Sequence, residues 1–93
     1  MTFWENKKVL ITGGAGFIGS NLAKDLVKSG ADIIIVDNLE RGKIEFIEDI
    51  YDSITFHMGD LKNKIFCNKV FSSDIDIVIH LASKVGGIGY YTE

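Results

Sequence analysis

The residues with the clearest chemical potential form a glycine-rich segment near the start of the chain. The segment Thr12-Gly13-Gly14-Ala15-Gly16-Phe17-Ile18-Gly19-Ser20 follows the apolar run Val9-Leu10-Ile11 and begins a helical pattern. A second apolar run, Ile33–Val36, is followed by Asp37, 18 positions after Gly19. A strand, a glycine turn, a helix, a second strand and an acidic residue at these distances are typical of a dinucleotide-binding βαβ unit.

Each glycine of this segment has a separate expected role. Gly13 lets the chain turn sharply out of the strand, where a Cβ would clash. Gly16 removes a side chain where a pyrophosphate must approach the backbone, and Gly19 lets the helix pack closely on the strand. The N–H groups of the first helical turn, which includes Phe17 and Ile18, then face the phosphates with a favourable helix dipole.

Asp37 is expected to accept hydrogen bonds from both hydroxyls of an adenosine ribose and to repel a 2′-phosphate, so the sequence favours NAD over NADP. Two alternatives are weaker. A glycine turn without a ligand does not account for the strand, helix and acidic residue around it. A nucleoside-triphosphate loop needs a lysine directly after its last glycine, but Ser20 and Asn21 follow Gly19.

Composition limits the class of protein further. With 93 residues, 46% of them hydrophobic, and a net charge of −3, the chain is expected to be at most one domain with a packed core. It has no basic stripe that would suggest nucleic acid, and its single Cys67 has no partner for a disulfide. No signal segment or membrane-length apolar run occurs, so we expect a soluble, cytoplasmic protein without membrane contact.

The apolar periodicity predicts a partial α/β fold. In the first helix, Ile18, Leu22 and Leu26 recur every four residues. Strands that are nearly continuously apolar and alternate with helices form a parallel sheet covered on both faces. Strands are predicted at about Lys7–Thr12, Asp32–Val36, Ser53–Met58 and Ile75–Leu81, and helices at about Gly16–Ser29, Ile44–Tyr51 and Asn63–Phe71.

Right-handed crossovers place these strands in the order 3-2-1-4, which is a Rossmann-type arrangement with helices on both faces. Ligands bind outside the carboxyl ends of the strands where the order reverses. The glycine turn after strand one and the segment Leu81-Ala82-Ser83-Lys84 after strand four are both expected at this crevice.

Four ordered motifs resemble the extended short-chain dehydrogenase/reductases, the NAD-dependent epimerases and dehydratases of nucleotide sugars. The motifs are Thr12–Gly19, Asp37-Asn38-Leu39, Gly59-Asp60-Leu61 and His80-Leu81-Ala82. The resemblance implies that Asp60 and Leu61 flank the adenine and that the backbone near Ala82 and Ser83 lines the cofactor. The complete predicted cofactor-binding set is Gly13, Gly16, Phe17, Ile18, Gly19, Asp37, Asn38, Asp60, Leu61, Leu81, Ala82, Ser83 and Lys84.

Several of these residues also have a purely structural interpretation. His80 at a strand end is expected to bond to nearby backbone rather than to catalyse, and His57 is expected to be an ordinary strand residue. Asp60 is a suitable N-cap for a helix beginning near Lys62, which is compatible with adenine binding. The tail Lys84–Gly89 resembles the segment between nicotinamide and sugar in GDP-sugar members of the family.

The family's acid/base pair is a tyrosine with a lysine four positions later. This sequence lacks the pair, since the residue four positions after Tyr51 is Thr55. The expectation is therefore that residues 1–93 form the N-terminal part of an NAD-binding domain, inactive alone, whose substrate in a complete enzyme is a nucleotide sugar. The alternatives are a non-catalytic dinucleotide-binding module and a decayed fragment. The apolar edge at Ile77–Ile79 further predicts self-association or a missing C-terminal partner.

Overall fold

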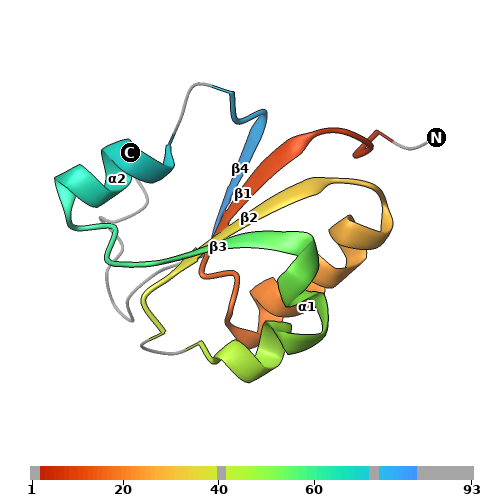
Figure 1. The fold of residues 1–93 in the computed structure, drawn as a ribbon, viewed down its shortest axis with the longest axis horizontal. Coiled ribbons are helices and arrows are strands. Elements are labelled where there is room, and N and C mark those ends of the chain that lie inside the picture. The colour runs from red at the N-terminus through yellow and green to blue at the C-terminus, as the bar shows by residue number, and fades with distance from the viewer. Residues whose placement is uncertain (1–2, 40–41, 72–73, 82–93) are drawn as a thin grey trace.

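The computed structural model describes residues 3–39, 42–71 and 74–81 of the chain. They form a parallel sheet with strand order β3-β2-β1-β4 and helices between the strands (Figure 1). The predicted Rossmann-type fold class and strand order are therefore confirmed. Along the chain the elements are β1 Lys8–Thr12, α1 Phe17–Lys28, β2 Asp32–Asp37, the 3₁₀ helix η1 Ile44–Ser53, β3 Ile54–Met58, α2 Lys64–Val70 and β4 Ile77–His80.

The register brings the carboxyl ends of the strands to one edge of the sheet. Thr12, the last residue of β1, pairs with Val36 of β2 on one side and with His80 of β4 on the other. Asp37 in turn lies beside Met58, the last residue of β3. The loops that follow all four strands therefore begin close together, as the predicted crevice requires.

Alternate strand residues form a fully buried core under α1 and η1, on one side of the sheet (Figure 1). The helices contribute Ala23 and Leu26 from α1 and Ile47 from η1. Leu26 matches the predicted i+4 stripe, but Ile18 does not, because it lies in the first helical turn and is 73% exposed. The strand residues of this core are Val9, Ile11, Ile33 and Ile35.

The opposite face is covered by α2, a helix of only seven residues. Its buried cluster contains Leu10 of β1, Val36 of β2 and Val70 of α2, with Phe66 packed against them. The predicted pairing of Phe66 and Val70 on one helix face is confirmed. Because α2 is short, it shields less of the sheet than the helices opposite.

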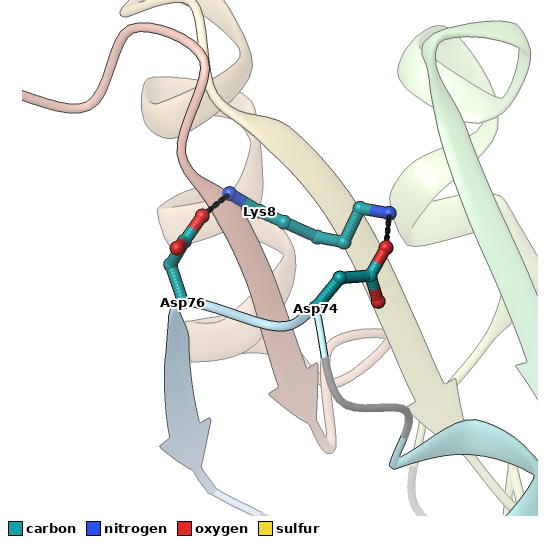
Figure 2. Close-up of polar contacts among 3 residues, drawn as sticks. All are labelled: Lys8, Asp74 and Asp76. Atoms are coloured by element: carbon teal, nitrogen blue, oxygen red, sulfur yellow. Dashed lines mark hydrogen bonds and ion pairs between the residues drawn. The ribbon is translucent and has the colours of Figure 1, made fainter.

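β4 begins two residues later than predicted, and the side chain of Asp76 accounts for this (Figure 2). The Lys8 N–H donates to Asp76 Oδ2 at 2.8 Å, and the Asp76 N–H donates to the Lys8 carbonyl at 2.9 Å. A carboxylate thus takes the hydrogen bond that a strand carbonyl would otherwise accept. The Lys8 ammonium forms an ion pair with Asp74 at 2.7 Å, and this hydrogen bond and the Asp74 charge raise the Lys8 pKa above its ordinary value of 10.5.

Candidate functional site

The glycine turn connects the buried end of β1 to the start of α1. Gly13 has a φ of 74°, a conformation that glycine adopts without the steric cost of a Cβ, as the predicted sharp turn requires. Its N–H donates to the Val36 carbonyl at 2.7 Å, and its own carbonyl accepts the Gly16 N–H at 3.1 Å. Gly16 is the N-cap residue of α1.

Gly19 makes the closest approach in this region. A Cβ on Gly19 would overlap the Gly13 carbonyl oxygen and lie 2.9 Å from Gly14 Cα. The glycine therefore packs α1 onto the turn itself, whereas the sequence suggested packing onto the strand. A Cβ on Gly16 would meet only the Gly13 oxygen, at 3.3 Å, so the other side of Gly16 is open.

The first turn of α1 presents backbone donors rather than side chains. No side chain caps this helix end, and its first turn contains no acidic residue. The first N–H groups of a helix have no intrahelical acceptor and carry the positive end of the dipole. Phe17 and Ile18, which are 70% and 73% exposed, contribute two of these groups. Such an end is suited to binding an anion.

Asp37 joins three loops at the carboxyl ends of the strands. Its Oδ2 accepts the N–H of Ala15 in the glycine turn at 3.0 Å, and its Oδ1 accepts the N–H of Leu39 at 2.8 Å. Its backbone carbonyl accepts the Gly59 N–H, after β3, at 3.1 Å. The residue is only 7% exposed. The side chain predicted to bind a ribose therefore also holds the glycine turn in place.

The neighbours of Asp37 differ in exposure. Asn38, from the predicted set, is exposed. Leu39 has a φ of 63°, which is uncommon for a residue with a branched side chain, and it packs against the core under α1 and η1.

Asp60 and Leu61 follow Gly59 after β3. Asp60 Oδ1 accepts the Lys62 N–H at 2.9 Å, but Asp60 does not cap α2. The N-cap is Asn63, whose Oδ1 accepts the Phe66 N–H at 3.0 Å, so the predicted capping role of Asp60 is wrong. Asp60 and Asn63 are both suitable N-caps. The chain makes a further turn after Asp60, so α2 starts only after Asn63. Leu61 packs against the core cluster under α2.

The ends of β1 and β4 are joined by a side-chain network that the sequence did not reveal. The Leu81 N–H donates to both the hydroxyl and the carbonyl oxygen of Thr12, each at 3.0 Å. Thr12 Oγ1 also lies 2.7 Å from His80 Nδ1 and shares a hydrogen bond with it. His80 was expected to bond to nearby backbone, but its partner in the structure is the Thr12 side chain. Ala82, Ser83 and Lys84 lie outside the described residues.

Other kinds of site find no support in the described ranges. Across residues 3–39, 42–71 and 74–81, no group of three or more histidine, cysteine or carboxylate side chains is placed to hold a metal ion. No helix among these residues is long and apolar enough to cross a membrane. Cys67 lies on α2, half-buried, and its Sγ–H donates to the Leu61 carbonyl at 2.9 Å.

Several known proteins are similar in sequence to most of this chain. A family model described as the NAD dependent epimerase/dehydratase family matches residues 9–93. A bifunctional UDP-glucose 4-epimerase and UDP-xylose 4-epimerase of Pisum sativum is 37% identical, over 83% of this chain and 25% of that protein. A UDP-N-acetyl-alpha-D-glucosaminuronate decarboxylase of Bacillus cytotoxicus is 41% identical, over 86% of this chain and 25% of that protein.

Solved structures give the same picture. The epimerase Mth375 of Methanothermobacter thermautotrophicus superimposes with a TM-score of 0.80 and 42% identity, over 87% of this chain and 24% of that chain. The Bordetella bronchiseptica enzyme WbmF in complex with NAD+ gives a TM-score of 0.79 and 30% identity, over 89% of this chain and 25% of that one. The chain therefore spans about a quarter of the length of the relatives it matches.

Proposed function

Because the chain belongs to the NAD dependent epimerase/dehydratase family, we propose that it forms the adenosine-binding side of an NAD site in a nucleotide-sugar epimerase or dehydratase. The observation that carries the proposal is the junction of three loops on the Asp37 carboxylate and carbonyl, at the strand ends where the sheet order reverses. Residues 1–93 are, in this proposal, the N-terminal part of the NAD-binding domain.

The described residues fit this cofactor. The open side of Gly16 and the N–H groups of the first turn of α1 suit the pyrophosphate. Each oxygen of the Asp37 carboxylate accepts one backbone N–H, and each has a second lone pair for a ribose hydroxyl. Bound NAD would supply a hydride acceptor. The remaining proposed contacts are Phe17, Ile18, Asn38, Asp60, Leu61, Leu81, Ala82, Ser83 and Lys84.

The substrate is proposed only as a nucleotide sugar. The names of the Pisum sativum and Bacillus cytotoxicus relatives refer to UDP sugars, whereas the tail Lys84–Gly89 resembles GDP-sugar enzymes. We further propose that this chain alone does not catalyse, because the tyrosine–lysine pair of the family is absent from its 93 residues. Sugar-nucleotide turnover that is proportional to the amount of purified chain would contradict this.

The expected cytoplasmic location stays part of the proposal, and cell fractionation tests it.

Calorimetric titration with NAD and NADP tests the cofactor assignment. The wild-type chain should bind NAD at least about tenfold more tightly, because a 2′-phosphate beside a buried carboxylate is repelled. Asp37→Ala also removes the acceptor of two backbone N–H groups, so its affinity for both cofactors should fall. The informative quantity is therefore the ratio of the two dissociation constants, which should approach one in the variant.

The matched control is Asp52→Ala, which removes an exposed carboxylate on η1 and should leave that ratio unchanged. A wild-type preference for NADP, or equal affinities, would overturn the assignment of Asp37. A wild-type chain that binds neither cofactor would overturn the proposed function itself.

A further inference from the structure

Gly42 lies against the glycine turn although 27 positions separate it from Ala15. Both residues are buried. The next residue, Lys43, donates its N–H to the Ala15 carbonyl at 3.0 Å. Since the Ala15 N–H donates to Asp37 Oδ2, both polar backbone groups of Ala15 are bonded to β2 or to the segment that follows it.

A side chain at position 42 has no room. A Cβ there would lie 2.7 Å from Asp37 Oδ2, 2.8 Å from the Ala15 carbonyl carbon and 2.9 Å from its oxygen. Two of these atoms belong to the backbone, and the third is held by the Ala15 N–H. None of them can move away without breaking a hydrogen bond, so an alanine at position 42 must displace the segment, the turn or the carboxylate.

We propose that Gly42 is a positioning residue for dinucleotide binding. It allows the segment after β2 to close onto Ala15, and this contact orients the Asp37 carboxylate before the cofactor arrives. The proposal rests on the proposed function for the identity of the ligand. The contact itself is formed by Asp37, Ala15, Gly42 and Lys43.

Gly42→Ala is the direct test, with NAD and ADP-ribose as the titrated ligands. Both dissociation constants should rise about tenfold or more, because one misplaced hydrogen-bonding carboxylate typically costs this much affinity. ADP-ribose lacks only the nicotinamide, so an equal effect on both ligands shows that the defect does not lie in contacts to the nicotinamide ring.

Gly30→Ala is the matched control for stability. Gly30 has a φ of 93° and lies near Glu5, at the opposite end of β2 from the crevice, so alanine is strained there as well. It should lower the urea midpoint yet leave both dissociation constants within about twofold. A folded Gly42→Ala variant that binds within about twofold of the wild type would overturn the proposal.

Amide hydrogen exchange on the wild-type chain gives a second, independent test that does not depend on the folding of a variant. The N–H groups of Ala15 and Lys43 should be protected before NAD is added, and NAD should change their protection little. Exchange as fast as that of an unstructured amide in the free chain would overturn the proposal. Because this measurement needs no ligand, it decides the proposal even if the wild-type chain binds neither NAD nor ADP-ribose and the proposed function fails.

Discussion

Within the described ranges, the face of the sheet that carries α1 and η1 buries eight hydrophobic residues, whereas the face that carries α2 buries three. The difference follows from the covering helices, since α1 has 12 residues and η1 has ten, against seven in α2. It also appears on β4, where Ile77 packs against the larger core and Val78, on the other face, is 48% exposed. Apolar burial therefore stabilises mainly one side of the sheet.

On the α2 face, polar contacts supplement this smaller core. Leu10 is the only apolar residue that β1 places there, and it is flanked by Lys8 and Thr12. Lys8 pairs with Asp74 just before β4, and Thr12 shares a hydrogen bond with His80 at its end. These contacts attach β4 at both ends. The comparison teaches that side-chain hydrogen bonds and an ion pair supplement the backbone pairing that joins β4 to β1.

Two adjacent isoleucines of β2 test the comparison with the largest expected effect. Ile35 is fully buried under α1, and Ile34 is partly exposed under α2. Ile35→Ala should lower the free energy of unfolding by about 2–5 kcal/mol, and Ile34→Ala by less than half as much, because less surface is lost from contact. Urea denaturation measures both. Equal losses would show that the two faces are equally packed.

Thr12→Val tests the polar attachment at the end of β4. Valine has the same shape but removes the hydroxyl that bonds to both Leu81 and His80, so the free energy of unfolding should fall by about 1–3 kcal/mol. Thr12→Ser keeps the hydroxyl and should lose less. A Thr12→Val variant that is as stable as the wild type would show that the network contributes nothing to the free energy of unfolding.

The exposed edge predicts weak self-association. Within the described ranges β4 pairs only with β1, and Val78 adds an apolar side chain beside the free edge. Light scattering after size-exclusion chromatography should show dimers that increase with concentration. Val78→Lys should reduce them, since a charge on an edge strand opposes pairing. A monodisperse wild-type monomer at high concentration would contradict the prediction.

The ion pair between Lys8 and Asp74, which is partly exposed, is expected to have the smallest effect on the free energy of unfolding. Because the Lys8 pKa is raised in the folded chain, its contribution to stability should be complete below pH 10.5 and decline as the pH rises through the higher folded value. Lys8→Gln should remove this decline in stability. Urea midpoints measured from about pH 9 to about pH 12, the range in which lysine titrates, test it. High salt should weaken the effect, since exposed ion pairs are screened.

Sequence patterns were sufficient for the fold, and the cofactor contacts of the predicted site residues stay predictions. Apolar periodicity located all the described strands and helices, and the right-handed crossover rule supplied the strand order. Errors occurred where local signals compete. Asp60 and Asn63 are both good caps, and only the path of the chain selects Asn63. The start of β4 moved because Asp76 bonds to the backbone of Lys8, a residue 68 positions away.

The residue types of the sequence alone determined the glycine turn and the acidic residue after the second strand, because these depend on local conformation and short spacing. The proposed class of ligand rests on the same residues. Only the tertiary structure decided that Asp37 holds the turn through Ala15, that Gly42 closes on both, and that Thr12 meets His80. These contacts join segments that are distant in sequence. Their geometry follows from strand register and loop path, which no local pattern encodes.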